Sequence, residues 1–313
     1  MPRIMIEAPA KINLHLRVGD RRPDGIHDIE SLFLALAFGD TLCLETASPA
    51  VQDTIHMTWP FTDPPVLPPE KNIISQAVSL FRSRTGFNQA LKITVEKRIP
   101  LGGGLGGGSS DAAAVLLGLN RLASADGPAG LSGAELAEMG ASLGSDVSFF
   151  LKDMSLAWVC GRGEKIQPLE LPEACRGLPL VLVNPGFPSG TAEAYRMLDL
   201  WRSGNKERGV LNRCAPQVFE FGAKPGEWPF FNDFLPVVQA VSGTGMVYQQ
   251  IIGSLRELGA DFAGLSGSGS TCFGVFSARD KAELARESLI KRWPFVIITF
   301  SLAFRAIQYY NCE

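Results

Sequence analysis

The chain has 313 residues, of which 46% are hydrophobic and 19% charged, so it has enough apolar material for a core and is not a disordered protein. Its formal net charge is −3, which argues against a general nucleic-acid binder, because such proteins present a strongly basic surface. Domains usually contain about 100–200 residues, so this length favours two lobes.

Six cysteines are spread along the chain without any C-x-x-C pair, which favours free thiols in a reducing cytosol over a zinc site or disulfides. The opening sequence MPRIMIEAPAKIN lacks the apolar stretch of a secretory signal. The longest mainly apolar run, residues 295–304, is too short for a bilayer, which takes about 20 residues. We therefore expect a soluble cytoplasmic protein that binds no membrane.

The first elements in chain order read as a sheet. Residues 4–18 alternate in part between apolar and polar side chains, which predicts a strand. The polar, turn-rich sequence GDRRPDGIHD predicts a loop over residues 19–28. Residues 31–44 are mainly apolar and are expected to continue the sheet, whereas the proline-rich residues 59–72 predict a loop.

A helix and a strand precede the most unusual stretch of the chain. Residues 72–81 have helical spacing with Asn72 as a candidate N-cap, and residues 91–97, LKITVEK, alternate as in a strand. The sequence IPLGGGLGGGSSDAAAVLLGL follows, and its apolar spacing predicts an amphipathic helix over residues 109–122.

The second half again mixes helices and strands. Ser132 and Glu135 fit a capping box that opens a short helix ending near Leu143. The run LPLVLVN over residues 178–184 predicts a strand, and residues 248–258 predict a helix that leads into the turn-rich GADFAGLSGSGSTCFGVF. This mixture predicts an α+β protein.

Six glycines before a helix start are suited to binding phosphate. Glycines let backbone N–H groups approach an anion closely, and the free amides of the first helical turn point to the same place. The stretch lacks the lysine of a Walker A loop, and it lacks the second strand and acidic residue of a dinucleotide-binding unit. A merely flexible turn is the remaining alternative. The glycine-serine turn within residues 264–276 is expected to form the opposite wall of the same cleft.

Three separated motifs resemble those of the GHMP kinases. They are APAKINLHL (residues 8–16), PLGGGLGGGSSDAA (residues 100–113) and GLSGSGSTCFGVF (residues 264–276). The segments DGIHDIESLF, LGSDVSFFL and NPGFPSGTAEAYRML resemble the family branch that phosphorylates a diphosphocytidyl methylerythritol in non-mevalonate isoprenoid synthesis. The resemblance implies a two-lobe α+β fold. An S5-like ATP-binding lobe would cover residues 1–168 and a ferredoxin-like lobe residues 169–313, with the active site between them.

The resemblance also implies the reaction and its residues. The family transfers the γ-phosphoryl group of ATP to an alcohol, here the 2-hydroxyl of the methylerythritol unit. Asp146 matches the catalytic aspartate, which would accept the hydroxyl proton. Lys11 matches the catalytic lysine, which would stabilise negative charge on the attacking oxygen. Without the resemblance, Asp146 reads as a helix cap and Lys11 as a solvated strand residue.

The expected nucleotide site takes in the whole glycine stretch and two residues beside it. Asn72 and Lys97 are candidates for the adenine side, and Mg²⁺ is expected with ATP although the sequence does not identify its ligands. Asp111 is acidic beside this site and fits equally a favourable interaction with the helix dipole. The expected phosphate-binding residues are Pro100, Leu101, Gly102, Gly103, Gly104, Leu105, Gly106, Gly107, Gly108, Ser109 and Ser110.

The expected substrate site contains Asn13, His27 and Phe187. The matching histidine in the family binds the cytosine of the substrate. The residue before it is usually Tyr, but here it is Ile26, so one stacking surface for cytosine is lost; Phe187 is the candidate for an opposing aromatic surface. Ser148 also departs from the usual proline after Asp-Val.

Other functions remain open from the sequence. A mevalonate-type GHMP kinase is the first, although residues 14–19 lack its Gly-Glu-His element. A catalytically silent nucleotide-binding protein is the second, and an NAD-dependent oxidoreductase is the third. The expected partner is a small cytidine diphosphate compound, without nucleic acid, and the sequence does not indicate a number of subunits.

Overall fold

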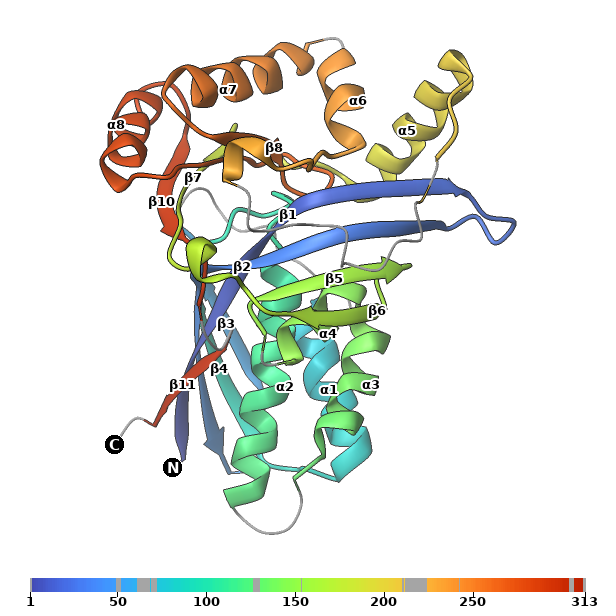
Figure 1. The fold of residues 1–313 in the computed structure, drawn as a ribbon. Coiled ribbons are helices and arrows are strands. Elements are labelled where there is room, and N and C mark those ends of the chain that lie inside the picture. The colour runs from blue at the N-terminus through green and yellow to red at the C-terminus, as the bar shows by residue number, and fades with distance from the viewer. Residues whose placement is uncertain are drawn as a thin grey trace.

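The computed structural model describes residues 2–48, 52–60, 68, 72–125, 130–152, 154–209, 211, 224–241, 243–303 and 307–311. Within them the chain forms two sheets, each with helices packed on it, and the two sheets stand one above the other (Figure 1). This is the two-lobe α+β architecture that the motifs predicted.

The larger sheet is built on a long antiparallel hairpin of β1 and β2. The predicted loop over residues 19–28 is shorter than expected, because β1 continues to Arg21 and β2 already begins at His27. β4 pairs antiparallel with the second half of β2 and in parallel with β3. β5 pairs antiparallel with the first half of β2. The strands are β1 (Arg3–Arg21), β2 (His27–Ala47), β3 (Thr54–Thr58), β4 (Ala90–Glu96), β5 (Leu156–Gly161), β6 (Lys165–Leu169) and β11 (Gln308–Asn311).

Four helices cover one face of this sheet (Figure 1). They are α1 (Ile73–Thr85), α2 (Gly107–Ala125), α3 (Gly133–Leu143) and α4 (Ser145–Leu151). Asn72 caps α1 by accepting a hydrogen bond from the amide of Ile74 at 2.9 Å. The capping box of Ser132 and Glu135 at the start of α3 is present, so both predicted helix starts are confirmed.

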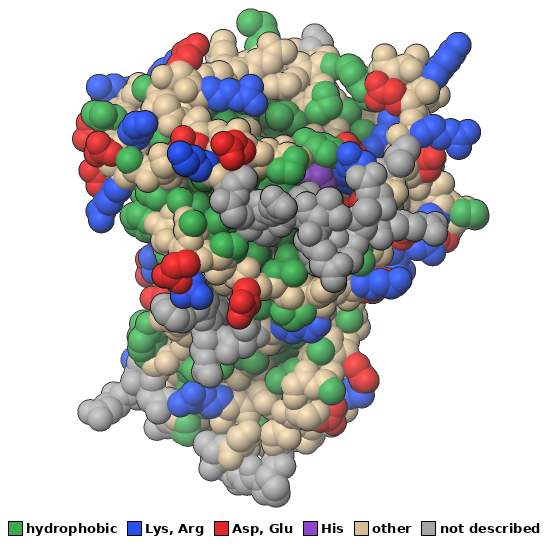
Figure 2. Space-filling view, viewed as in Figure 1, with side chains coloured by type: hydrophobic (Ala, Val, Ile, Leu, Met, Phe, Trp, Pro, Cys, Tyr) green, Lys and Arg blue, Asp and Glu red, His purple; other side chains and the backbone are tan. Residues whose placement is uncertain are grey.

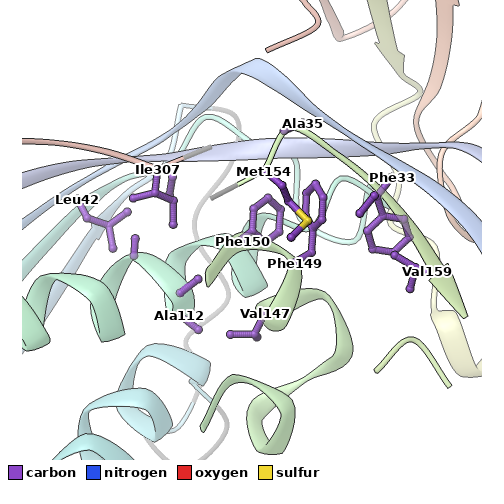
Figure 3. Packing of buried hydrophobic residues seen from close by; sticks show 14 of the residues in the cluster. Phe33, Ala35, Leu42, Ala112, Val147, Phe149, Phe150, Met154, Val159 and Ile307 are labelled. Carbon is purple, nitrogen blue, oxygen red and sulfur yellow. The ribbon is translucent and has the colours of Figure 1, made fainter. Parts of the chain in front are cut away.

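An aromatic cluster fixes α4 against the sheet (Figure 3). Phe149 and Phe150 point from α4 into the core, where Phe149 meets Phe33 of β2 edge-on with ring centroids 5.4 Å apart. Burial of each such side chain contributes about 1.5–3 kcal/mol. The short helix is therefore held by its own apolar side chains, which fixes the position of Asp146 in its first turn.

The smaller sheet has the strand order β10-β7-β9-β8, with all neighbours antiparallel. Its strands are β7 (Pro179–Asn184), β8 (Phe262–Leu265), β9 (Cys272–Val275) and β10 (Phe295–Phe300). The accompanying helices are α5 (Thr191–Asn205), α6 (Phe234–Ala240), α7 (Gly245–Glu257) and α8 (Arg279–Leu289). The predicted strand over 178–184 and the predicted helix over 248–258 correspond to β7 and α7.

The proposed division between residues 168 and 169 falls at the end of β6, but the last described strand of the chain returns to the larger sheet. β11 pairs antiparallel with the start of β1, so residues 308–311 join the larger sheet and not the second lobe. On the face drawn in Figure 2, acidic and basic side chains are interspersed. In the described ranges no helix has the length and apolar character to cross a membrane.

Candidate active site

The glycine-rich stretch forms a loop that opens onto a cleft. We call residues 100–106 the glycine loop. Gly102, Gly104 and Gly106 have φ values of 63°, 75° and 73°, a conformation that favours glycine. α2 begins at Gly107, two residues earlier than predicted, so the free amides of its first turn adjoin the loop. The loop lines a cavity of about 380 Å³ that also contains Lys11 and Asp146.

Four consecutive carbonyl groups of the glycine loop are bound to other parts of the chain. The carbonyl oxygens of residues 102 to 105 accept hydrogen bonds, in order, from Ser189 N, Thr271 N, Ser266 Oγ and Lys11 N, at 2.8–3.1 Å. Within the part of the chain that the structure describes, no hydrogen bond uses the amides of residues 102–106 as donors. Because anions are bound by N–H groups, this loop is suited to phosphate.

The turn between β8 and β9 packs directly on the glycine loop. A Cβ on Gly104 would lie 2.1 Å from Ser266 O, so no side chain fits there. Gly267 and Ser268 of the turn line the same cleft as the loop. The prediction that this turn shares one cleft with the glycine loop is therefore confirmed, although the turn packs on the loop itself.

Lys11 and Asp146 meet at this cleft. Lys11 Nζ lies 3.2 Å from Asp146 Oδ2, with the lysine side chain 5% exposed and the aspartate side chain 30% exposed. The pairing of β1 with β2 shifts in register between Pro9 and Lys11, directly before the lysine. The structure thus brings together two predicted residues from distant motifs, one buried and one open to the cleft.

Asn13 fixes the position of the lysine. Lys11 Nζ donates to Asn13 Oδ1 at 2.7 Å, and it lies 4.4 Å from the centroid of the Phe33 ring. Asn13 Nδ2 in turn donates to Ser31 Oγ at 2.8 Å. The amide of Asn13 is therefore oriented with its oxygen towards the ammonium, which has two oxygen acceptors and an aromatic face around it.

A second cavity, of about 580 Å³, adjoins the first and shares Asp146, Thr191 and Tyr195 with it. His27 lines this cavity. It is 7% exposed at the start of β2, so it is a buried strand residue and does not lie in the predicted loop. Its Nδ1 lies 2.9 Å from Gly19 O, and since a carbonyl only accepts, Nδ1 carries the proton. Nε2 lies 3.4 Å from Asp199 Oδ1.

Tyr195 is the aromatic residue beside His27, and the sequence analysis missed it. The two ring centroids are 5.1 Å apart. Burial, together with the negative charge of Asp146, raises the pKa of Tyr195 to about 12, so the phenol keeps its proton. Phe187 instead packs edge-on against Tyr248 and is not among the described residues that line either cavity. The sequence could have indicated Tyr195, because it lies in the same segment as Phe187, NPGFPSGTAEAYRML.

Two further predicted nucleotide residues are not among the described residues that line the cleft. Asn72 uses its Oδ1 to cap α1, and its neighbour Ile73 lines the cleft. Ser110 is fully buried in α2, and its hydroxyl has no hydrogen-bond partner among the described residues, whereas Ser109 lines the cleft. Roles for Asn72 and Ser110 in nucleotide binding stay predictions.

Lys97 lines the cleft but its ammonium is also buried in an ion-pair cluster. Lys97 Nζ donates to Asp40 Oδ2 and, at 2.5 Å, to Asp111 Oδ2. Burial acts to lower the pKa of Lys97, but the charges of Asp111 and Asp40 outweigh it and raise this pKa overall. Burial raises the pKa of Asp111 well above its usual range, against the opposing effect of Lys97. Asp111 therefore binds Lys97 in this buried cluster, and Asp40 is a member of the cluster that the sequence analysis missed.

The cleft offers few ligands of its own to a metal ion. Over the ranges that the structure describes, no group of three or more His, Cys, Asp or Glu side chains could hold one. Ser109 and Asp146 are side-chain oxygen donors that face the cleft. A hard cation such as Mg²⁺, which keeps several waters and binds substrate phosphates, fits this sparse donor set.

Comparison with protein families gives two matches. The family profile for the GHMP kinases N terminal domain matches residues 72–153, which include the glycine loop and Asp146. The profile for the GHMP kinases C terminal domain matches residues 247–294, which include the turn between β8 and β9.

Individual proteins are similar over most of the chain. A 4-diphosphocytidyl-2-C-methyl-D-erythritol kinase from Treponema pallidum (strain Nichols) is 36% identical over 94% of this chain and 97% of its own length. A protein of the same name from Anaeromyxobacter dehalogenans (strain 2CP-C) is 39% identical over 90% of this chain and 83% of its own length. A crystal structure of 4-(cytidine 5'-diphospho)-2C-methyl-D-erythritol kinase matches with a TM-score of 0.75, 32% identity and coverage of 95% and 99%. The L. major mevalonate kinase, at TM-score 0.66, 14% identity and 95% coverage of each chain, shares the fold.

Proposed function

The chain belongs to the 4-diphosphocytidyl-2-C-methyl-D-erythritol kinase family of GHMP kinases, and from this membership we infer that it transfers the γ-phosphoryl group of ATP to the 2-hydroxyl of that diphosphocytidyl alcohol. Such an enzyme is an ATP-dependent phosphotransferase of isoprenoid precursor synthesis. Its cleft then holds ATP on one side and the alcohol on the other.

One observation carries this proposal. The contact between Lys11 and Asp146 lies where the cavity of the glycine loop adjoins the cavity of His27. A phosphoryl transfer needs its donor and acceptor to meet at one point, with a carboxylate to receive the acceptor's proton. Asp146 borders both cavities, so a hydroxyl beside it would face a triphosphate held by the glycine loop.

The catalytic roles follow from charge and position. Asp146 accepts the proton of the attacking 2-hydroxyl. Lys11, held by Asn13, stabilises the negative charge that develops on the attacking and transferred oxygens. The free amides of the glycine loop and of the first turn of α2 bind the phosphates. Because phosphoryl transfer needs little covalent help from the protein, this positioning supplies most of the catalysis.

Magnesium is proposed as the ion that accompanies ATP. When bound, it would neutralise negative charge on the phosphates of ATP. Ser109 and Asp146 are the side chains that would contribute to holding it, with phosphate oxygens and water supplying the remaining ligands.

The second cavity suits a cytidine diphosphate group. His27 lines it with Nδ1 donating to Gly19 O and Nε2 facing Asp199 Oδ1 at 3.4 Å, and the carboxylate of Asp199 is an acceptor suited to the amino group of cytosine. Tyr195 supplies an aromatic face beside it, and Ile26 the apolar surface. Arg162 and Arg196 also line this cavity, and their positive charges are suited to the two phosphates.

The deciding experiment measures ADP release from ATP with three alcohols in parallel: the diphosphocytidyl methylerythritol, mevalonate and homoserine. We expect turnover with the first alone, and phosphorus NMR of the product to show a new phosphomonoester beside an intact diphosphate. Comparable turnover with mevalonate would favour the mevalonate-type alternative. ATP binding without turnover of any alcohol would favour the silent nucleotide-binding protein, and NADH binding without ATP binding the oxidoreductase.

A further inference from the structure

A buried group of charged residues lies directly behind the glycine loop. Asp40, Lys97 and Asp111, which we call the clasp, are 1%, 5% and 2% exposed. They come from β2, from the residue after β4 and from the first turns of α2. The ammonium of Lys97 joins the two carboxylates. The roles proposed for Lys11 and Asp146 do not involve the clasp.

The clasp holds both ends of the glycine loop. At the entry, Asp40 Oδ1 accepts hydrogen bonds from the amides of Arg98 at 2.5 Å and Ile99 at 2.9 Å. At the exit, Asp111 binds Lys97 from α2. Asp40 also lies close to the start of α2, because a Cβ on Gly107 would be 3.5 Å from its Oδ2. The ammonium of Lys97 thus connects the segment before the glycine loop with α2, the helix that follows it.

Stability alone does not explain such a cluster. Removing charges from water costs several kcal/mol per ion, and a well-packed apolar group of the same volume would usually serve stability as well. A loop with glycines at positive φ, by contrast, has much conformational freedom to lose. Fixing its two ends places the amides before ATP arrives, which lowers the entropic cost of binding the phosphates.

We propose that Asp40, Lys97 and Asp111 are positioning residues for phosphate binding, which fix the entry and exit of the glycine loop so that its amides are held in the geometry that binds the phosphates of ATP. The proposal rests on the function proposed above for the loop. It gives Lys97 a role beyond contact with adenine, since two of its three N–H groups are used within the clasp.

Charge in the clasp is compatible with a nearby anion. Two ionised carboxylates and one ammonium would leave a net negative charge behind the phosphates. Burial raises the pKa of Asp111, so that its protonated form is favoured and the clasp then carries one positive and one negative charge.

The test compares ligands that differ only in their phosphates. Asp111→Ala and Asp111→Asn are prepared in the full chain, and calorimetry gives the Kd of each for ADP and for adenosine. We expect the preference for ADP over adenosine to fall about tenfold in Asp111→Ala, the loss typical of one hydrogen bond to a charged group, with adenosine binding unchanged. Asp111→Asn, which retains the shape and a hydrogen-bonding group, should recover most of this preference.

Asp53→Ala is the matched control. It breaks another ion pair of the same lobe, between Asp53 and Arg82, neither of which lines the cleft of the glycine loop. This variant should lose stability and keep its ADP preference. In steady state, Asp111→Ala should raise KM for ATP, with KM for the alcohol within about twofold of wild type.

An unchanged ADP preference in folded Asp111→Ala, or the same fall in Asp53→Ala, would overturn the proposal. If Asp111→Ala does not fold, a wild-type ADP preference together with a wild-type KM for ATP in Lys97→Met would overturn it as well. The binding measurements need no turnover. Failure of the wild type to phosphorylate any alcohol would therefore count against the proposed function. It would not change what the binding measurements show about the clasp.

Discussion

At the residue scale, the lysine and the aspartate of the cleft depend on each other and on Asn13. Lys11 is nearly buried, and its ammonium has Asp146 and Asn13 as oxygen partners. Removal of either charged residue leaves the other without its counter-charge at the point where the proposed mechanism places the developing charge. The two residues should therefore affect the chemical step far more than nucleotide binding.

We expect Asp146→Asn and Lys11→Ala each to lower kcat by about 10²–10⁴-fold, the range for loss of a general base or of a charge that stabilises the transition state. Binding of ADP, measured by calorimetry, should stay within about threefold of wild type. Lys92→Ala, which removes an exposed lysine paired with Glu45, is the control and should keep full kcat. Wild-type turnover in either cleft variant would remove that residue from the mechanism.

Recognition of the base gives a second prediction at this scale. Tyr195 lies beside His27, and an aromatic–base contact contributes about 1–3 kcal/mol. Tyr195→Ala should therefore raise KM for the diphosphocytidyl alcohol about tenfold or more, with KM for ATP unchanged. Ile26→Tyr adds a second aromatic face and should lower that KM. Phe187→Ala serves as the comparison, since its ring packs on Tyr248, and equal effects of Phe187→Ala and Tyr195→Ala would contradict this assignment.

Asp111 should give stability a measurable pH dependence. Burial raises its pKa to about 8 in the folded chain, against about 3.9 in an unfolded chain. Between these values the folded state binds more protons than the unfolded state, so the free energy of unfolding contributed by this group falls as pH rises from about 4 to about 8. Asp111→Asn removes the titrating carboxyl group and therefore this pH dependence. Denaturant unfolding at pH 5 and pH 8 should show the variant gaining stability relative to wild type, whereas a constant difference would contradict the assignment.

At the scale of elements, the glycine loop is defined by what packs against it. Gly104 combines a φ of 75° with a neighbouring carbonyl that leaves no room for a side chain. Gly86, after α1, has a similar φ of 72° and open space around it. An alanine at Gly86 would meet only the strain of the left-handed backbone, whereas an alanine at Gly104 would also meet a steric clash.

Gly86→Ala should cost about 1–2 kcal/mol of unfolding free energy, the strain of the left-handed conformation alone. Gly104→Ala should cost clearly more and should abolish measurable ADP binding, because the loop must move away from Ser266 O. Chemical denaturation and calorimetry on both variants test this. Equal stability losses with retained ADP binding in Gly104→Ala would show that the turn and the loop move apart easily.

Elements with local signals could be predicted from the sequence. The Asn72 cap, the capping box of Ser132 and the glycines before α2 each act within a few residues, so the pattern and the structure agree. The burial of His27 and the place of Tyr195 could not be predicted, because each depends on contacts between β2 and α5, which lie far apart in the chain. The pairing of Lys11 with Asp146 followed from the family resemblance and not from residue pattern.

At the scale of the whole molecule, the cleft joins parts of both lobes. The turn between β8 and β9 binds the glycine loop, and Asn13 N of β1 donates to Ser266 Oγ at 3.3 Å. The lobes are thus linked at the site itself. Predicting this required the resemblance, since the chain length favoured two lobes and the mixed strand and helix patterns predicted an α+β class, but neither indicated how the lobes meet.

A chain ended after residue 307 tests the return of β11 to the larger sheet. Loss of β11 leaves the residues of β1 from Ile4 to Glu7 with a free edge, which favours association between copies. We expect a lower denaturation midpoint and concentration-dependent aggregation, seen by light scattering, while the remaining monomer keeps its KM for ATP. The double change Tyr309→Ala and Tyr310→Ala, which retains the strand backbone, is the control. A monomer of unchanged midpoint would show that β11 is dispensable.

The pairing of β11 with β1 also bears on how the protein is made. β1 is translated before its partner β11, and every strand of the smaller sheet lies between them in the chain. Domains generally fold in order during synthesis, but the edge of this sheet stays open until residue 311 has been added. The larger sheet is therefore begun before the smaller sheet and closed only after it, and for that interval the nascent polypeptide exposes the edge of β1.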